Sequence, residues 1–381
     1  MFTVSLVKCD SYEAEAMQTL TQKLMMQLGG MDKYIKPGMK VLIKPNLLMK
    51  KTPDEAVTTH PALVEAVVRL VQQAGGEVTL ADSPGGPYNE KILKSLYAAT
   101  GLEAVAQKTG AKLNYDVTFK EVPFAEGKVT KSFPVITPVL QADFVITLAK
   151  LKTHGMTTFT GCVKNLFGVI PGTYKAEYHF RMKEMADFCG MLVDLCEYVK
   201  PGLAIMDGVM GMEGAGPSAG TPRKVGVLLA SENPHALDLV ATAIIGLKPD
   251  RVKTLANAVE RKLCVQSVED VTIVGEPWNS FYIDNFKIPD TFGAKFAKFI
   301  PEFMQRGLFN SVSPKPVFID DMCVRCGDCA RLCPPKAISM AGKLPKIDFD
   351  KCIKCFCCQE LCPKKAIEIK RPAWLKWLLK L

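Results

Sequence analysis

Two matching cysteine motifs near the carboxy-terminal end dominate the chemistry of this 381-residue chain. Each motif reads C-x2-C-x2-C-x3-C-P, with Cys323, Cys326, Cys329 and Cys333 in the first copy and Cys352, Cys355, Cys358 and Cys362 in the second. Three thiolates on one tight loop reach three corners of an iron–sulfur cube, and the fourth cysteine serves a neighbouring cube. We therefore expect two [4Fe–4S] clusters, one held by Cys323, Cys326, Cys329 and Cys362 and the other by Cys333, Cys352, Cys355 and Cys358.

The spacing favours these clusters over two alternatives. The motifs repeat after 29 residues and are followed by similar segments, which indicates a duplicated unit with pseudo-twofold symmetry. Zinc sites prefer pairs of C-x2-C separated by a spacer, so structural zinc is disfavoured. Disulfides are disfavoured because we expect no secretory signal, and fourteen cysteines then point to a reducing compartment. Cys357, beside Cys358, is interpreted as a spare thiol near the second cluster.

Composition and charge exclude some classes of partner. The formal net charge is +9, but two clusters on eight thiolates would remove about four positive charges. The remaining charge is weak evidence for a nucleic-acid partner and no nucleic-acid motif accompanies it, so we expect none. No run of about 18 apolar residues predicts a spanning helix. We expect a cytoplasmic protein.

The first part of the chain alternates apolar strands with helices. Strands are predicted at 3–8, 41–48, 78–82, 144–149, 203–207 and 225–230, and helices at 13–29, 62–74, 90–110, 180–199 and 234–246. This alternation predicts an α/β fold with a mainly parallel sheet. The domains expected are an α/β domain at 1–270, an aromatic-rich connector at 271–315, a small α+β two-cluster domain at 316–370 and an amphipathic tail at 371–381.

Polar side chains follow the predicted strands, where ligands bind in doubly wound sheets. Lysines, hydroxyls and amides at that edge suit an anionic small molecule. The residues expected to bind it are Lys44, Asn46, Asp82, Thr153, Asn165, Asp207 and Glu213, and those expected to act in the chemistry are Lys152, His154 and Lys164. We expect Lys44, Asp82, Lys152, His154 and Lys164 to converge on one pocket, and neither Lys152 nor His154 to be needed for the core. His60 and His235 suit structural roles at helix starts, and His179 is left open.

Three segments carry a family resemblance: Leu151–His154, Gly161–Gly168 and Ala81–Gly86. They resemble the large domain of unknown function 362, over about residues 1–270, and residues 316–369 resemble bacterial two-cluster ferredoxins. The resemblance implies the same two-part architecture. It assigns no reaction.

The leading hypothesis is electron transfer coupled to redox chemistry on an anionic small molecule in the α/β cleft. The clusters would exchange single electrons with a redox partner protein or reductant, while Lys152, Lys164 and His154 position the ligand or donate protons. One alternative is a non-enzymatic electron carrier or adaptor. Another is a non-redox isomerase or transferase with structural clusters.

The tail at 371–381 predicts peripheral membrane contact or docking to a second subunit. Trp374, Trp377, Leu378 and Leu381 share one helical face, and eleven residues are too few to span a bilayer. If the tail binds membrane, the full chain should float with liposomes and a chain ending at Lys370 should not. Identical flotation of the two chains would remove the membrane hypothesis.

Overall fold

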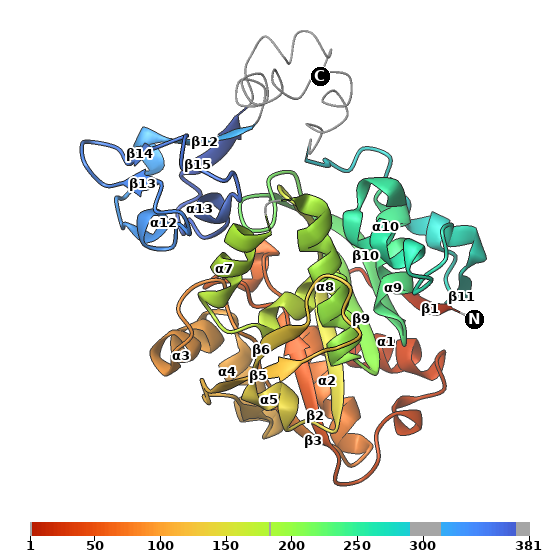
Figure 1. Cartoon of the computed structure of the whole chain (residues 1–381). Helices are drawn as coiled ribbons and strands as arrows, with labels where there is room; N and C mark the ends of the chain where they lie inside the picture. Colours follow the sequence, from red (N-terminus) through yellow and green to blue (C-terminus); the bar gives the residue numbers. More distant parts are fainter. Residues whose placement is uncertain (1, 183, 290–313, 371–381) are drawn as a thin grey trace.

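The computed structural model describes residues 2–182, 184–289 and 314–370 (Figure 1). Its main body is a nine-stranded sheet with the order β11-β1-β10-β9-β7-β2-β3-β4, and β8 pairs separately with β7. The strands are β1 Thr3–Lys8, β2 Lys40–Pro45, β3 Glu77–Leu80, β4 Lys112–Leu113, β7 Phe144–His154, β8 Thr158–Thr160, β9 Leu203–Glu213, β10 Thr221–Ser231 and β11 Thr272–Gly275. A hairpin of β5 Phe119–Pro123 and β6 Ser132–Ile136 stands apart from the sheet.

The sheet is mainly parallel, which confirms the predicted α/β class. Strands β9, β7, β2, β3 and β4 pair in parallel, as do β1 and β11. The antiparallel pairs are β1 with β10, β10 with β9, and β7 with β8. The short link from Glu213 to Thr221 explains the β9–β10 pair, because a parallel pair needs a long crossover.

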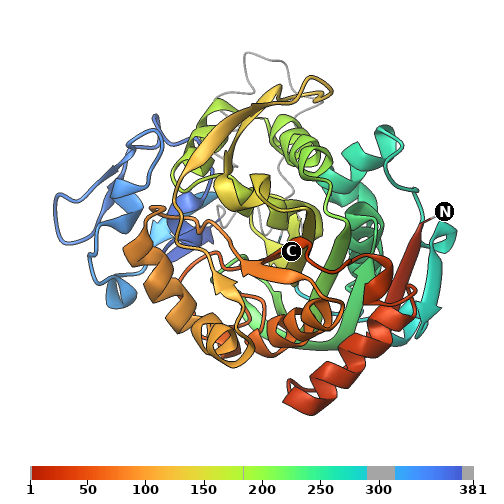
Figure 2. The same ribbon diagram turned by 90° about the horizontal axis from the view of Figure 1, so that it is seen from below.

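Helices cover both faces of the sheet (Figure 2). One face carries α1 Ala14–Met26, α2 Pro61–Gln73, α3 Glu90–Ala99 and α4 Leu102–Thr109. The other carries α6 Cys162–Asn165, α7 Tyr174–Arg181, α8 Met185–Val199, α9 Pro234–Ile244 and α10 Lys253–Glu260, with α5 Thr137–Leu140 beside the β5–β6 hairpin. Short 3-10 turns lie at Met31–Lys33, Pro53–Glu55, Leu166–Val169, Pro249–Arg251, Val268–Asp270, Trp278–Phe281 and Asp320–Met322.

Alternation along the strands places the core on both faces. In β2, Val41 and Ile43 pack with the α1–α4 layer, while Leu42 packs with the layer that contains α8. In β9, Ile205 and Met206 divide in the same way between the two layers. Successive side chains of a strand point to opposite faces, so a strand buried on both sides is a continuous apolar run.

Several predicted boundaries are wrong for identifiable reasons. The strand predicted at 144–149 continues to His154, and the strand predicted at 203–207 continues to Glu213. These extensions are buried although they contain charged residues, because partners lie across the neighbouring strands and loops. The helix predicted at 90–110 is divided at Gly101, whose φ of 78° glycine adopts readily. The helix predicted at 180–199 begins only at Met185.

The carboxy-terminal part repeats its backbone as well as its sequence. It contains β12 Lys315–Phe318, α12 Asp328–Arg331, β13 Ile338–Ser339, β14 Lys346–Ile347, α13 Cys357–Glu360 and β15 Ile367–Lys370. Left-handed residues recur at the 29-residue spacing, as Arg325 and Lys354, Gly327 and Phe356, and Lys336 and Lys365. Each half of the predicted duplication therefore turns in the same way around its cysteines.

The predicted connector is only partly described. Strand β11 falls within it and pairs with β1 at the edge of the main sheet. Residues 290–313, and the predicted tail at 371–381, lie outside the described residues. In the described part of the chain, no helix has both the length and the apolar character needed to cross a membrane.

His60 caps helix α2, and we expect it to make the stability of the fold depend on pH. Its Nδ1 accepts the Ala62 N–H at 3.2 Å, and its ring stacks on Tyr12 at 3.6 Å between centroids. Burial lowers the pKa of His60 to about 4 from an ordinary value of 6.5, so the ring is neutral in the fold.

Between pH 7 and pH 5 the unfolded chain gains a proton at His60 that the folded chain does not, and the fold loses stability as the pH falls. The variant His60→Asn keeps a capping acceptor of the kind found at Asn89 and Asn233. Between pH 7 and pH 5, the free energy of unfolding should therefore fall by about 1–2 kcal/mol less in His60→Asn than in the wild type. This range includes a discount for the partial exposure of His60. Urea denaturation of both full chains at the two pH values measures this, and equal losses would contradict it.

Candidate functional site

The eight motif cysteines gather in two groups of four. One small cavity is lined by Cys323, Cys326, Cys329 and Cys362. Another is lined by Cys333, Cys352, Cys355 and Cys358, and Cys357 also reaches it. The Ala337 N–H donates to Cys333 Sγ at 3.3 Å, and the Ala366 N–H donates to Cys362 Sγ at 3.2 Å. Four thiol groups with backbone donors at the exchanged cysteines form a donor set that fits an iron–sulfur cluster.

A larger cavity of ≈ 230 Å³ lies between the α/β part and the cysteine-rich part. The α/β part contributes Lys44, Asn46, Asp82, Ser83, Lys152, Thr160, Lys164, Asn165, Phe167, Lys175 and His179, among others. The cysteine-rich part contributes Arg331, Leu332, Cys333, Pro334, Lys336, Cys357, Glu360 and Leu361. Cys333, which belongs to one of the cysteine groups, therefore shares a wall with the lysines at the carboxyl ends of the strands.

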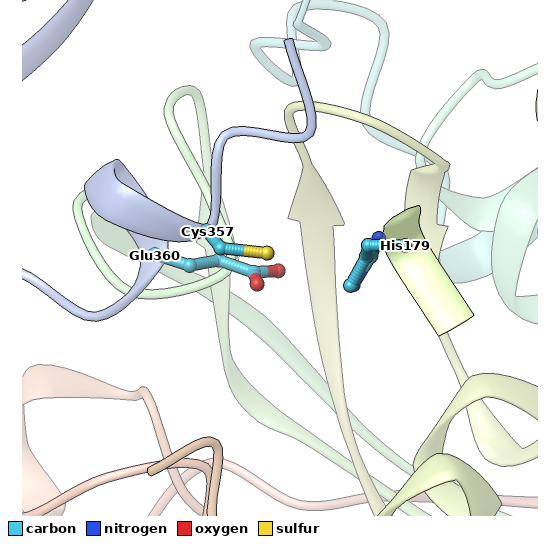
Figure 3. A group of neighbouring side chains, drawn as sticks. All are labelled: His179, Cys357 and Glu360. Carbon is cyan, nitrogen blue, oxygen red and sulfur yellow. The ribbon is translucent and has the colours of Figure 1, made fainter. Parts of the chain in front are cut away.

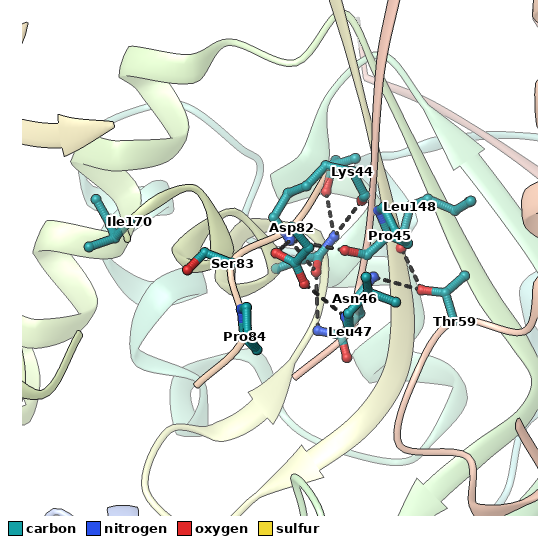
Figure 4. A network of polar contacts seen from close by, with 12 residues as sticks. Lys44, Pro45, Asn46, Leu47, Thr59, Asp82, Ser83, Pro84, Leu148 and Ile170 are labelled. Atoms are coloured by element: carbon teal, nitrogen blue, oxygen red, sulfur yellow. Dashed lines mark hydrogen bonds and ion pairs between the residues drawn. The ribbon is translucent and has the colours of Figure 1, made fainter. Parts of the chain in front are cut away.

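Lys44 and Asp82 form a buried ion pair in the floor of this cavity (Figure 4). Their Nζ and Oδ1 atoms are 2.7 Å apart, and Leu47 N–H donates to Asp82 Oδ2 at 2.8 Å. Burial lowers the pKa of Lys44 and raises the pKa of Asp82. The charge of Asp82 opposes the shift of Lys44, and the charge of Lys44 opposes the shift of Asp82. Gly168 is required beside the pair, because a Cβ there would overlap both Asp82 Oδ1 and Lys44 Nζ.

Lys175 fixes the loop that follows Asp82. Its Nζ donates to Ser83 Oγ at 3.1 Å, to Pro84 O at 3.2 Å and to Ile170 O at 2.5 Å. Burial lowers the pKa of Lys175 to about 7. All three donor positions of an ammonium are thus used by the protein, which indicates a structural role for this lysine.

Lys152 is buried, and among the described residues no carboxylate pairs with it. Its Nζ donates to Asn46 Oδ1 and to Val57 O, both at 2.7 Å, and its side chain lines the cavity. Burial, with a smaller contribution from the nearby charge of Lys164, lowers its pKa well below the ordinary value. Two of the three positions on Nζ are occupied by neutral acceptors, which leaves the third for a ligand.

Three further polar groups in the cavity wall have no hydrogen-bond partner among the described residues. They are Thr160 Oγ1 and His179 Nδ1, both buried, and the Lys164 ammonium, which lies 5.8 Å from the Phe167 ring centroid. Unpaired buried polar groups are costly, so native structures rarely keep them without a function or a partner. Together with Lys152, they line one cavity and remain available to a ligand.

His154 does not line the cavity but reaches across its edge. Its Nε2 lies 2.5 Å from Glu360 Oε1 of α13, while its Nδ1 accepts the N–H groups of Met156 at 3.0 Å and Thr157 at 3.3 Å. Because Nδ1 accepts, the proton of the neutral ring lies on Nε2, facing Glu360. Burial, reinforced by Lys164, lowers the pKa of His154 to about 4.

Other contacts seat α13 on the α/β part. Ser218 Oγ donates to Glu360 O at 2.6 Å, and Gln359 Nε2 donates to Ala215 O at 3.1 Å. Leu361 approaches Gly85 closely, because a Cβ there would lie 2.6 Å from Leu361 Cδ2 and would require that side chain to move. In Figure 1 the blue carboxy-terminal part accordingly rests on the loops above the sheet.

The structure brings together six of the residues predicted for the site: Lys44, Asn46, Asp82, Lys152, Lys164 and Asn165. The other four do not line the cavity: His154, described above, and three residues with partners elsewhere. Thr153 donates to Gly214 O at 2.9 Å, Asp207 pairs with Lys150, and Glu213 accepts from Lys287 N–H at 3.1 Å. Lys152 and His154, which were expected to be dispensable for the core, are only 1% and 2% exposed, so their replacement is expected to cost stability.

Sequence reasoning missed Lys175, Glu360 and the position of Cys357. One signal was present in the repeat. Cys357 and Glu360 occupy the places that Asp328 and Arg331 hold in the first half, so the duplication departs from its own pattern there. Such a departure indicates a function specific to the second half.

Comparison with known proteins supports both parts of the chain. Residues 41–243 match the family described as domain of unknown function (DUF362), and residues 315–363 match the 4Fe-4S dicluster domain. A thylakoid-associated protein of Synechocystis sp. is 36% identical over 294 residues, which cover 76% of this chain and 88% of that protein. These matches confirm the family resemblance predicted from three short motifs.

Two solved structures overlap weakly with the fold. The lactate racemase apoprotein from Thermoanaerobacterium thermosaccharolyticum gives a TM-score of 0.39 at 11% identity, over 61% of this chain and 54% of that one. A protein from Thermotoga maritima gives 0.36 at 13% identity, over 60% and 57%. This chain thus spans little more than half of each.

Neighbouring lysines on β7 offer a matched test of the buried charges. Lys150 lies opposite Asp207 in the sheet, and their charged atoms are 2.9 Å apart, whereas Lys152 meets only neutral acceptors. Lys150→Met leaves a buried carboxylate without its counterion and should lower the free energy of unfolding by about 3–5 kcal/mol. Lys152→Met should cost only about 1–3 kcal/mol. Chemical denaturation of both variants measures these losses. A larger loss of free energy of unfolding for Lys152→Met than for Lys150→Met would contradict the prediction.

Proposed function

Because the chain belongs to the DUF362 family and also contains a 4Fe-4S ferredoxin-type domain, we propose that it couples electron transfer to redox chemistry on a small anion. The anion occupies the ≈ 230 Å³ cavity between the two parts of the chain. One observation carries the proposal: Cys333 of the ferredoxin-type domain and the unpartnered donors of the α/β part line the same cavity.

The cysteines would hold two clusters in the arrangement predicted from their spacing. Cys323, Cys326, Cys329 and Cys362 surround one position, and Cys333, Cys352, Cys355 and Cys358 surround the other. When bound, the clusters supply single electrons. The group that includes Cys333 is the one next to the anion.

The remaining residues bind and orient the anion. Within the part of the chain that the structure describes, the Lys164 ammonium and the Thr160 hydroxyl have no hydrogen-bond partner, and Lys152 offers its third Nζ position. With its lowered pKa, Lys152 can give up or take a proton at Nζ near neutral pH more readily than an exposed lysine. Lys44 and Asp82 are occupied by each other and fix the floor of the cavity.

His154 takes a different role from the one predicted. Both of its ring nitrogens have partners, the Met156 and Thr157 N–H groups on one side and Glu360 on the other. It therefore positions α13 and helps to exclude water from the cavity. In this proposal Lys152, and not His154, exchanges protons with the anion.

An electron carrier or adaptor is less well supported. Such a protein needs exposed clusters and a docking surface, but it does not need unpaired polar groups around a cavity. A non-redox isomerase or transferase would use the same cavity, so only the electron transfer separates it from our proposal. Association with a membrane surface is proposed by analogy, since the Synechocystis relative is thylakoid-associated.

The test compares anaerobically purified wild type with Lys164→Gln, and uses Lys253→Gln on an exposed part of α10 as the control. All three should contain about eight iron atoms and eight acid-labile sulfides. Mass spectrometry should identify a small anion retained by the wild type and the control. Loss of one charged hydrogen bond should weaken its binding to Lys164→Gln about 10–100-fold.

The redox step is followed by absorbance after dithionite reduction. Adding the identified anion should reoxidise the wild type and Lys253→Gln, and Lys164→Gln should respond at least about tenfold more slowly at the same concentration. Equal retention of the anion by Lys164→Gln would contradict the binding site. Tight binding with no change in oxidation state would favour the isomerase or transferase.

A further inference from the structure

We propose that the α/β part and the ferredoxin-type domain together bind one divalent transition-metal ion of the Zn²⁺ or Fe²⁺ class through His179, Cys357 and Glu360. None of these ligands is one of the eight motif cysteines, although Cys357 also lines the cavity of Cys333, Cys352, Cys355 and Cys358. It goes beyond the proposed function, because it requires neither electron transfer nor a particular anion.

The three side chains converge across the contact between the two parts of the chain (Figure 3). Cys357 and Glu360 extend from α13, and His179 extends toward them from α7. Their nearest potential ligand atoms all lie within 4.8 Å of one another, and all three residues are buried. Small side-chain rotations would bring such atoms to the separation found around one ion.

An independent observation points to a missing ligand. His179 is 5% exposed, and its Nδ1 has no hydrogen-bond partner in the described part of the chain. The ring is nevertheless fixed, since it stacks on Phe188 at 4.4 Å between centroids. A buried ring nitrogen held in place without a polar partner is unusual unless something binds it.

The duplicated unit provides an internal comparison. The positions equivalent to Cys357 and Glu360 are Asp328 and Arg331, which form an ion pair with each other near the surface. In the second half, the same two positions carry a soft and a hard metal ligand on the side that faces the α/β part. Asp328 and Arg331 of the first half therefore pair with each other. Cys357 and Glu360 cannot form such an ion pair, and a bound metal ion would give them a common partner.

The donor set defines the class of metal. Thiolate, imidazole and carboxylate are ligands of Zn²⁺ and of metals of similar softness. Three protein ligands leave a fourth position, and all three residues line the cavity, so that position opens toward the proposed anion. The thiolate and the carboxylate together balance the charge of a divalent ion.

Neighbouring residues support the ligands in the way metal sites require. His154 Nε2 lies 2.5 Å from Glu360 Oε1 and orients that carboxylate. Outer contacts of this kind fix the geometry of metal ligands. With the ion neutralised by its own ligands, the free ammonium of Lys164 favours an anion in the fourth position.

The test titrates Zn²⁺ into the full, anaerobically purified chain with its iron content measured throughout. We expect the wild type to bind one additional Zn²⁺ per chain without loss of iron. His179→Ala should bind Zn²⁺ at least about 10–100-fold more weakly with unchanged iron, because His179 is remote from the motif cysteines in sequence.

A matched control uses the second group of candidate ligands, Cys196, Glu197 and His235, which lies outside the cavity. His235→Gln should bind Zn²⁺ as the wild type does. Zinc-edge X-ray absorption should show one sulfur at about 2.3 Å and nitrogen or oxygen at about 2.0–2.1 Å.

Three results would overturn the assignment. They are equal Zn²⁺ binding by wild type and His179→Ala, loss of binding in His235→Gln alone, and a shell of four sulfurs, which would place the ion among the motif cysteines. The proposed function fails separately, if Lys164→Gln retains the anion. The two proposals can therefore be judged independently.

Discussion

The burial of lysine ammonium groups at the carboxyl ends of a parallel sheet is the constraint on which the site depends. Lys44 and Lys150 are each matched by a carboxylate, whereas Lys152 has only amide and carbonyl acceptors. A buried charge without a counterion is destabilising. The protein reduces this effect at Lys152 through two close hydrogen bonds and a lowered pKa. Lys44 and Lys152 thus give the cavity a polar wall that is shielded from bulk water.

The sequence predicted the parts of this structure that repeat a simple period. Alternation of strands and helices gave the α/β class, and cysteine spacing gave the two groups of four. It did not predict that β7 continues to His154, because a lysine-rich segment is ordinarily exposed and the partners that allow burial, such as Asp207 and Val57, are distant in sequence. Glu360 and Lys175 were missed because their roles arise from tertiary contacts alone.

The second half of the ferredoxin-type domain is specialised for contact with the α/β part. Phe356 adopts the left-handed conformation that Gly327 adopts in the first half, at the start of the short helix that carries Cys357 and Glu360. A bulky residue in that conformation carries strain, which is typically retained where it serves a function. Residues 356–361 contain the strained turn and also make the contacts with the α/β part. These contacts are the hydrogen bonds with Ala215 and Ser218 and the approach of Leu361 to Gly85.

The cavity has walls from both parts of the chain, and this has a thermodynamic consequence. No compartment of this shape exists unless the ferredoxin-type domain is seated, so anything that binds inside must also strengthen the seating, by an amount set by its concentration and affinity. The relation is reciprocal. The contacts of α13 with the loops of the α/β part thus contribute to affinity for the occupant, although none of them needs to touch it.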